Sequence, residues 1–382
     1  MKKYKVAYIS GTRADFGIVR RYLSYLSDDE AIDFSVLVTG AHLEKTYGYT
    51  VDDIRADGFF VEEEFPIGIN TENTACVIES MSRALRLFGE YFQEHKYDLL
   101  IVLGDRYEIM AASIAAAMQK IPLLHLHGGE QTLGNYDEFI RHSITKMSNF
   151  HFTSTEDYRR RVIQLGERPD RVFYMGALGA ENCHKINLAQ VDERVLKLPC
   201  KKYFTVVYHP ETLTDGNVEL QAINLLSALD SFSSEYGFVF IGSNADTGAS
   251  RISMLFQRAA RECDNFLYFE SLTSDSYLHL VKNSIALIGN SSSGIIEAPS
   301  LNTYTVNIGK RQDGRIRSGG VIDIDCSKES IERAIREVLD KVKAGICFDN
   351  PYFKPDCAEN YYKKTKEILS IKDNSPKVFY DL

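Results

Sequence analysis

The fold is decided by residues 99–130, which read LLIVLGDRYEIMAASIAAAMQKIPLLHLHGGE. Residues 99–103 form a short apolar run, which predicts a buried strand, and a helix rich in small residues is expected after it. Residues 123–127 repeat the strand pattern and lead into Gly128 and Gly129. Such alternation of strands and helices is typical of a parallel α/β sheet.

Ionisable side chains gather where these two strands end. Asp105 and Arg106 follow the first strand, Glu130 follows the second, and Asp137 and Glu138 come soon after. Ligands of parallel α/β sheets bind beyond the carboxyl ends of the strands, so the group as a whole points to chemistry. For any one of these residues alone, a place in a solvated loop is an equally good interpretation.

Length and composition predict a two-domain protein without a nucleic-acid-binding surface. The chain has 382 residues, which is long for one hydrophobic core, and its formal net charge is −9. Glycines and polar residues at 176–183 interrupt the pattern of strands and helices. We therefore predict domains at residues 1–177 and 178–355.

The cysteines and the apolar runs predict a cytoplasmic protein with no membrane contact. Seven cysteines form no C-x-x-C pair, which favours a reducing compartment and argues against structural zinc. No apolar run is long enough for a signal peptide or a membrane span. No G-x-G-x-x-G motif occurs, so we expect neither a dinucleotide cofactor nor a metal.

Two further loops of the first half follow predicted strands. Residues 5–10 lead into a loop with Arg13 and Asp15, and residues 34–39 lead to His42. Backbone N–H groups and Arg13 could bind an anion there, although an ordinary turn between a strand and a helix has the same form. His42 by itself is more typical of a loop histidine than of a catalyst.

Residues 74–96 predict a long amphipathic helix. Its apolar residues recur at steps of three and four, which predicts that they form one core-facing stripe. They are Ala75, Ile78, Met81, Leu85, Phe88 and Phe92.

The second half repeats the order of strand, polar loop and helix. His209 follows the strand predicted at residues 203–208, and Asn244 and Asp246 follow the strand predicted at residues 238–241. Each strand of this half therefore also delivers polar groups at its carboxyl end.

Ser291 and Ser292 form the best candidate for a phosphate site. They follow a strand predicted at residues 286–288 and precede a helix, so they either bind an anion or simply cap that helix. Glu297 lies one turn further on and would repel phosphate, but it suits the two hydroxyls of a ribose. The basic loop at residues 309–317, with Arg311, either closes over a pyrophosphate or is a flexible surface loop.

Taken in order, these motifs resemble the hydrolysing branch of the UDP-N-acetylglucosamine 2-epimerases over residues 11–353. Residues 135–148 and 153–167 are especially similar to the bacterial members that serve sialic-acid capsule synthesis. The motifs that carry the resemblance are Gly11-Thr12-Arg13-Ala14-Asp15, Leu103-Gly104-Asp105-Arg106, Gly128-Gly129-Glu130, Asp137-Glu138-Phe139-Ile140-Arg141-His142, His209-Pro210, Gly289-Asn290-Ser291-Ser292-Ser293-Gly294 and Gly309-Lys310-Arg311-Gln312.

The resemblance implies two Rossmann-like domains in a GT-B-type arrangement with the active site in the interdomain cleft. A helix and tail at residues 356–382 would cross back to the first domain. The implied reaction converts UDP-GlcNAc and water to UDP and N-acetylmannosamine, by elimination of UDP and hydration of a glycal, and feeds sialic-acid synthesis. The implied assembly is a homodimer or a homotetramer.

The resemblance also assigns roles to residues by position. The catalytic candidates are Asp105, His127, Glu130, Asp137, Glu138 and His209. The substrate-binding candidates are Arg13, Asp15, His42, Arg106, Asn244, Asp246, Ser291, Ser292, Glu297 and Arg311.

One position departs from the family pattern. Many relatives have Glu-Gly-Gly-Glu where this chain has His127-Gly128-Gly129-Glu130, so either His127 or Glu130 takes over the role of the missing acid. Histidine can transfer protons near neutral pH without a large pKa shift, so the replacement is chemically tolerable.

Three other functions fit the same motifs. A GT-B glycosyltransferase would use a UDP-sugar together with an acceptor, and a related hydrolysing epimerase would use a UDP-2,4-diacetamido-trideoxy sugar. A protein that only binds nucleotide sugars would show no turnover. The several acidic groups of the first domain favour an epimerase over the other two classes.

Overall fold

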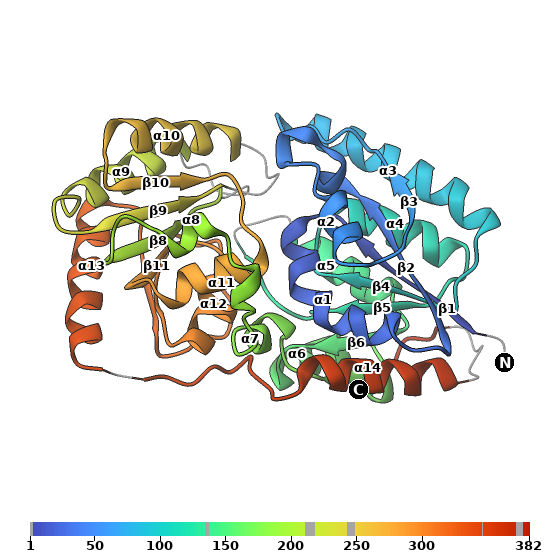
Figure 1. The fold of residues 1–382 in the computed structure, drawn as a ribbon. Coiled ribbons are helices and arrows are strands. Elements are labelled where there is room, and N and C mark those ends of the chain that lie inside the picture. The colour runs from blue at the N-terminus through green and yellow to red at the C-terminus, as the bar shows by residue number, and fades with distance from the viewer. Residues whose placement is uncertain (1–2, 134–136, 211–217, 243–248, 346, 372–376) are drawn as a thin grey trace. The chain divides into compact units, whose positions relative to one another are not determined.

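The structure is a computed structural model that describes residues 3–133, 137–210, 218–242, 249–345, 347–371 and 377–382. The chain forms two compact units, each built on one parallel sheet with helices packed on it (Figure 1). Unit 1 comprises residues 1–130, 137–181 and 354–382, and unit 2 comprises residues 131–136 and 182–353. The predicted α/β class is confirmed.

The sheet of unit 1 has seven strands in the order β3-β2-β1-β4-β5-β6-β7, and all paired strands are parallel. The strands are β1 (Tyr4–Ser10), β2 (Ile32–Thr39), β3 (Val61–Phe65), β4 (Leu99–Leu103), β5 (Leu123–Leu126), β6 (Phe150–Thr153) and β7 (Val172–Tyr174). The helices are α1 (Arg13–Ser27), α2 (Val51–Ala56), α3 (Thr74–Glu94), α4 (Tyr107–Met118), α5 (Asp137–Met147), α6 (Glu156–Gln164) and α14 (Cys357–Ser370), with short 3-10 turns η1 (Gly40–Leu43), η2 (Lys45–Tyr47) and η3 (Pro169–Arg171).

The sheet of unit 2 has six parallel strands in the order β10-β9-β8-β11-β12-β13. The strands are β8 (Tyr203–Val207), β9 (Gly237–Ile241), β10 (Phe266–Phe269), β11 (Ala286–Gly289), β12 (Tyr304–Ile308) and β13 (Val321–Ile324). The helices are α8 (Glu193–Leu196), α9 (Val218–Asp230), α10 (Ala249–Glu262), α11 (Ser274–Lys282), α12 (Ser293–Ile296) and α13 (Lys328–Lys343), with η4 (Leu188–Gln190) and η5 (Ala298–Leu301). Helix α7 (Leu178–Asn182) lies at the boundary of the two units.

Both faces of the first sheet are buried. Val6 and Tyr8 of β1 pack in the cluster that includes residues of α1 and α14, while Ala7, which points to the opposite face, is also fully buried. Helices α1 and α14 are joined by a hydrogen bond of 2.7 Å between the hydroxyls of Tyr22 and Thr365. The terminal helix is therefore part of the core of unit 1.

Helix α3 confirms the predicted helix and the second half of the predicted stripe, because Phe88 and Phe92 are buried, but not the first half. Ile78 is 61% exposed and Leu85 is 39% exposed, whereas Ser80 and Ala84 are buried. The helix packs against α4, and small side chains on its inner face let the two helices approach closely. In the first half of the helix, the buried face is therefore turned by about one position from the stripe that the apolar pattern predicted.

The strand order places a topological switch point in each sheet. In unit 1 it lies between β1 and β4, and in unit 2 it lies between β8 and β11. Ligands of doubly wound sheets bind beside such switch points, at the carboxyl ends of the strands. The loops that carry most of the predicted site residues follow these four strands and β5. Among the described residues, no helix is both long and apolar enough to cross a membrane.

The end of β11 requires glycine. Gly289 has a φ of +138°, and a Cβ at this position would lie 1.9 Å from the carbonyl oxygen of Val207 in β8. Only a residue without a side chain lets the two strands meet there, so this glycine sets the start of the loop that carries Ser291.

We expect Gly289→Ala to destabilise unit 2 more than Gly345→Ala. Both glycines have a positive φ, but a Cβ at Gly345 would meet no atom within 4 Å. Gly345→Ala should therefore lower the free energy of unfolding by about 1 kcal/mol from backbone strain alone. Gly289→Ala should lower it by roughly 1–3 kcal/mol more from the clash. Urea unfolding of both variants measures the difference, and equal losses would contradict the role of the close approach.

Candidate active site

A buried guanidinium joins the loops after β4 and β5 to helix α5. Arg141 of α5 is 2% exposed and forms an ion pair with Asp105 in the loop after β4. Its Nη1 also lies 3.6 Å from Oε2 of Glu138 and donates a 2.9 Å hydrogen bond to the carbonyl oxygen of Glu130. Since a buried charge needs partners, Arg141 brings together three of the predicted catalytic positions.

His127 is held at the start of the loop after β5 in an unusual backbone conformation. Its φ is +64°, which imposes about 1–2 kcal/mol of strain on a residue with a side chain. The backbone N–H donates a 2.8 Å hydrogen bond to the carbonyl oxygen of Phe152 in β6. Strain of this kind persists where the surrounding structure enforces it, often at functional sites.

The imidazole of His127 is oriented by a carboxylate. Its Nδ1 lies 3.0 Å from Oε1 of Glu130, and the hydroxyl of Ser154 donates a 2.6 Å hydrogen bond to that same oxygen. Within the described residues, the buried Nε2 of His127 has no hydrogen-bond partner. If Nδ1 carries the ring proton and donates a hydrogen bond to Glu130, Nε2 is the ring atom that can accept or deliver a proton in catalysis.

His125 supports the loop that carries Asp105. Its Nε2 lies 2.8 Å from the carbonyl oxygen of Gly104, and its Nδ1 lies 3.1 Å from Oγ1 of Thr145 in α5. Burial lowers the pKa of His125 to about 3, so the ring is neutral, with Nε2 donating to the carbonyl and Nδ1 accepting from the hydroxyl. His125 therefore connects α5 to the β4 loop.

Glu108 forms an ion pair with Arg106 and packs against the loops after β1 and β2. Arg106 Nε donates a 2.5 Å hydrogen bond to Oε1 of the fully buried Glu108. A Cβ on Gly11 would lie 2.8 Å from that carboxylate oxygen, and a Cβ on Gly40 would lie 2.6 Å from the carbonyl oxygen of Gly11. The loops after β1, β2 and β4 therefore pack tightly around one carboxylate.

Arg13 and Asp15 lie at the start of α1, directly after β1. Thr12 caps the helix, because its Oγ1 accepts a 3.2 Å hydrogen bond from the N–H of Asp15. Arg13 is half-buried, and its Nε lies 3.5 Å from Oδ2 of Asp53. The structure thus places both residues beside the switch point of unit 1, while their predicted contact with substrate stays a prediction.

His42 is buried and supports the loop after β2, while its predicted contact with substrate stays a prediction. Its Nε2 lies 2.8 Å from the hydroxyl of Ser10, and its Nδ1 lies 2.8 Å from the hydroxyl of Thr50. Burial lowers the pKa of His42 to about 4, and the nearby charges of Arg13 and Arg106 lower it further. With both ring nitrogens used inside unit 1, His42 fixes the loop after β2.

We expect His42 to make the protein sensitive to mild acid. Its pKa of about 4 in the folded state lies below the ordinary value of 6.5, so the unfolded chain takes up the proton first and stability falls between these two pH values. Between pH 7 and pH 5 this loss should amount to about 2 kcal/mol. In urea unfolding, His42→Gln should be less stable than wild type at pH 7 but lose about 2 kcal/mol less on going to pH 5. An unchanged loss would contradict the assignment.

In unit 2, a buried amide joins the loops after β8 and β11. The side chain of Asn290 accepts a 2.7 Å hydrogen bond from the N–H of His209 and donates a 2.8 Å hydrogen bond to the carbonyl oxygen of His209. His209 is itself buried. The loops beside the switch point of unit 2 are therefore held together by neutral hydrogen bonds, whereas the loops beside the switch point of unit 1 are held together by charged side chains.

The serine-rich loop leads into α12 without a side-chain capping hydrogen bond from the N-cap residue, Ser292. Ser291 Oγ accepts a 3.3 Å hydrogen bond from the N–H of Ser293, and α12 is only four residues long. Ser291 and Ser292 are half-buried, and Glu297 at the end of α12 is buried. The loop is placed at the carboxyl end of β11 as predicted, and its contact with a nucleotide stays a prediction.

The basic loop after β12 is folded onto the switch point of unit 2. Arg311 Nη1 and Gln312 Nε2 donate hydrogen bonds of 3.1 Å and 2.8 Å to the carbonyl oxygen of Asn290. Arg317 Nη1 donates a 2.8 Å hydrogen bond to the carbonyl oxygen of Gln312. These bonds argue against a flexible surface loop. Asn244 and Asp246 lie outside the described residues.

Sequence reasoning gave no role to four residues that organise the site, namely Glu108, Arg141, Ser154 and Asn290, although Arg141 and Asn290 lie within the motifs quoted above. Arg141 is three residues after Glu138, which was a usable signal for a pair on one helix face. The link between Ser154 and Glu130 spans 24 residues and had no local signal. Among the described residues, no group of three or more His, Cys, Asp or Glu side chains is arranged to hold a metal ion.

Comparison with known proteins gives one family over most of the chain. The sequence profile of the UDP-N-acetylglucosamine 2-epimerases matches residues 24–366. The chain is 46% identical to polysialic acid biosynthesis protein P7 of Escherichia coli, over 99% of this chain and 97% of that protein. It is 35% identical to UDP-N,N'-diacetylbacillosamine 2-epimerase (hydrolyzing) of Legionella pneumophila, over 95% of this chain and 96% of that protein.

Solved structures support the same fold. The UDP-GlcNAc 2-epimerase of Methanocaldococcus jannaschii, in complex with UDP-GlcNAc and UDP, superposes with a TM-score of 0.80. The match covers 95% of this chain and 99% of that chain at 18% sequence identity. This confirms two parallel-sheet α/β domains of the GT-B type.

Proposed function

Because the chain belongs to the UDP-N-acetylglucosamine 2-epimerase family, we propose that it converts UDP-GlcNAc and water to UDP and N-acetylmannosamine. The observation that carries this proposal is the cluster around Arg141, which gathers Asp105 and Glu138 beside the pair formed by His127 and Glu130. Several acid–base groups at one edge of a sheet suit a reaction that moves a proton off one carbon and back onto it.

The chemistry of the substrate sets the order of the steps. The hydrogen on C2 of the sugar is not next to a carbonyl, so removing it as a proton without assistance would leave an unstabilised carbanion. Departure of UDP from C1 therefore leads, and the positive charge that develops at C1 acidifies the C2 hydrogen. Loss of that proton gives a 1,2-unsaturated glycal, and water then adds at C1 while a proton returns to C2 from the other face. Two proton-transfer groups are needed.

We assign one proton transfer to His127 and the other to the carboxylates near Arg141. His127 has a ring nitrogen oriented by Glu130, which is how catalytic imidazoles are commonly prepared for proton transfer. Asp105 and Glu138 are partly exposed, so they can reach a bound sugar, while Arg141 holds them in place. Asp137, the first residue of α5, is the remaining candidate by family resemblance.

We assign the UDP moiety to residues of unit 2, with help from Arg13. Ser291, Ser292 and Arg311 surround the end of β11, and donors there would stabilise the negative charge that gathers on departing UDP. Glu297 is assigned to the ribose hydroxyls. Asn244, Asp246, Asp15, Arg106 and His209 enter this proposal through the resemblance alone.

A second substrate is supported by two relatives, the Legionella protein and a Campylobacter jejuni protein that is 36% identical over 85% of this chain and is also named for diacetylbacillosamine. The Legionella protein that is 35% identical to this chain is named for UDP-N,N'-diacetylbacillosamine, which differs from UDP-GlcNAc in the sugar. The relative with 46% identity is named for polysialic acid biosynthesis, and this favours UDP-GlcNAc and a role in sialic-acid synthesis. The sialic-acid role, the cytoplasmic location and the predicted homodimer or homotetramer remain part of the proposal.

The substrate proposal is tested by offering each UDP-sugar without any acceptor. We expect UDP-GlcNAc alone to give equal amounts of UDP and N-acetylmannosamine, identified by NMR. Faster turnover of the diacetamido sugar would identify the second substrate instead. Release of UDP-N-acetylmannosamine, with UDP still attached, would contradict the hydrolysing reaction, and turnover only with an added acceptor would indicate a glycosyltransferase.

We expect substitutions in the two units to separate catalysis from UDP binding. His127→Asn keeps a residue that tolerates a positive φ and should lower kcat by roughly 10² to 10⁴ while leaving the Kd for UDP nearly unchanged. Glu297→Gln should mainly weaken UDP binding, because it removes a contact made equally in substrate and transition state. Calorimetry with UDP and single-turnover kinetics measure the two effects. The reverse pattern would contradict the assignment.

A further inference from the structure

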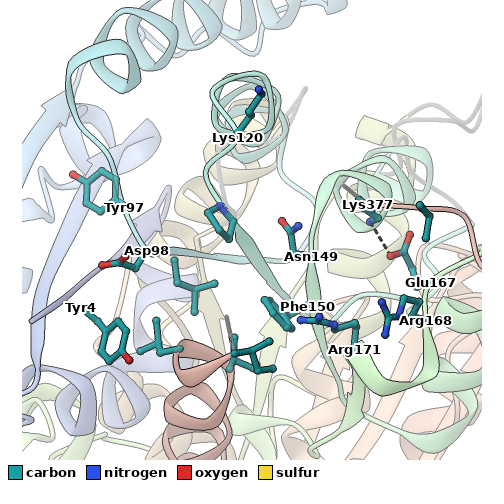
Figure 2. A pocket seen from close by; sticks show the side chains of 16 residues that line it. Tyr4, Tyr97, Asp98, Lys120, Asn149, Phe150, Glu167, Arg168, Arg171 and Lys377 are labelled. Atoms are coloured by element: carbon teal, nitrogen blue, oxygen red, sulfur yellow. Dashed lines mark ion pairs between the residues drawn. The ribbon is translucent and has the colours of Figure 1, made fainter. Parts of the chain in front are cut away.

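Residues 377–382 are anchored in unit 1 through Lys377, whose side chain is 25% exposed. Figure 2 shows Lys377 pointing toward Glu167, and its Nζ lies 2.7 Å from Oε2 of that carboxylate. The same Nζ donates a 3.2 Å hydrogen bond to the carbonyl oxygen of Thr145 and another to that of Ser148. Burial lowers the pKa of Lys377, while Glu167 opposes this shift. These three partners, and not deep burial, hold the ammonium group in place.

Glu167 is the common partner of three groups. Lys146 Nζ lies 2.7 Å from its Oε1, and His151 Nε2 lies 3.1 Å from its Oε2. Burial raises the pKa of Glu167, but the hydrogen bonds from His151, Lys146 and Lys377 outweigh burial and lower it to about 2. The carboxylate is therefore ionised and ties Lys377 to strand β6 and to the end of α5.

Two neighbouring residues fasten the same segment. The N–H of Tyr380 donates a 2.9 Å hydrogen bond to the carbonyl oxygen of Gly166. The ring of Phe379 packs so closely that a Cβ on Gly166 would lie 2.2 Å from it, and Lys146 Nζ lies 4.9 Å from the ring centre. Beside this segment lies a cavity of about 360 Å³, whose lining includes Lys377 of the C-terminal segment and Phe150 of β6 (Figure 2).

The lysine acts on the end of the helix that carries the proposed catalytic groups. Thr145 is in the last turn of α5, and its carbonyl oxygen also accepts a 3.2 Å hydrogen bond from the N–H of Ser148. Lys377 is a second donor to this oxygen, and a cation at this end of a helix interacts favourably with the helix dipole. Glu138 is in the first turn of the same helix, and Arg141 is in its middle, four residues before Thr145. Eight residues of helix, about 12 Å, separate Asp137 from Thr145.

A chain of hydrogen bonds continues from Thr145 to the β4 loop. Thr145 receives Lys377 at its carbonyl oxygen, and its hydroxyl lies 3.1 Å from Nδ1 of His125. Nε2 of His125 lies 2.8 Å from the carbonyl oxygen of Gly104, the residue before Asp105. Lys377 is thus linked to the loop of Asp105 through Thr145 and His125. It is linked to Arg141 through helix α5.

We propose that Lys377 is a positioning residue, which fixes the end of α5 so that Arg141 holds Asp105 and Glu138 in their reactive arrangement. This inference rests on the proposed function, since it concerns the carboxylates assigned to catalysis there. Lys377 touches no reacting atom in this account, and its effect is on the placement of groups that do.

The test compares Lys377→Met with Lys363→Met in the full chain. Lys363 is an exposed lysine of α14 that pairs with Glu359 one turn away, so it controls for the loss of a positive charge. Lys377→Met should lower kcat between about 10-fold and 100-fold, with KM and the Kd for UDP within twofold of wild type. Lys377→Arg, which can still donate to Glu167 and the two carbonyl oxygens, should restore most of kcat.

Hydrogen exchange gives a readout independent of turnover. Amides of α5 should exchange faster in Lys377→Met than in Lys363→Met, while those of unit 2 stay unchanged. Phe379→Ala removes a more exposed contact of the same segment, so it should also lower kcat and speed α5 exchange, but by smaller amounts than Lys377→Met. This variant replaces Lys377→Met in the test if Lys377→Met does not fold. Unchanged α5 exchange would overturn the inference whatever the activity. Failure of the wild type to act on any UDP-sugar would instead overturn the proposed function.

Discussion

The buried guanidinium of Arg141 is the interaction on which the first half of the structure depends. A charge that is 2% exposed is stable only with partners, and the chain supplies them from three elements, namely the β4 loop, the β5 loop and α5 itself. Removing Arg141 would remove the ion pair to Asp105 and one hydrogen bond to the carbonyl oxygen of Glu130. The same side chain thus links local folding to the placement of acid–base groups.

The two units solve one structural problem with different chemistry. In both sheets the loops beside the switch point must be held at a fixed separation. Unit 1 uses ionised groups, with Arg141 against carboxylates and Glu108 against Arg106. Unit 2 uses the neutral amide of Asn290, which bonds to both backbone groups of His209. Charged clusters suit proton transfer, and a neutral frame with basic donors suits the binding of an anionic leaving group.

The fold and the positions of the site loops could be predicted from the sequence, because both depend on local patterns. Short apolar runs that end in glycine and a polar residue marked β4, β5 and β11 at nearly the observed bounds. The inner face of α3 was predicted correctly at Phe88 and Phe92 but wrongly in the first half of the helix, since apolar spacing does not reveal that small residues such as Ala84 are buried there. The positive φ of His127 and the burial of Arg141 arise from contacts distant in sequence, so no local pattern could have shown them.

The measurement that tests the account most directly is the isotope content of the product formed in D₂O. If UDP leaves first, the C2 proton is lost to a protein group, and a proton from solvent returns from the other face. N-acetylmannosamine made from UDP-GlcNAc in D₂O should therefore carry one deuterium at C2, visible by NMR, and a variant slowed at the second step should release the glycal. Product with only protium at C2 would contradict the proposed elimination and the roles given to His127 and the carboxylates around Arg141.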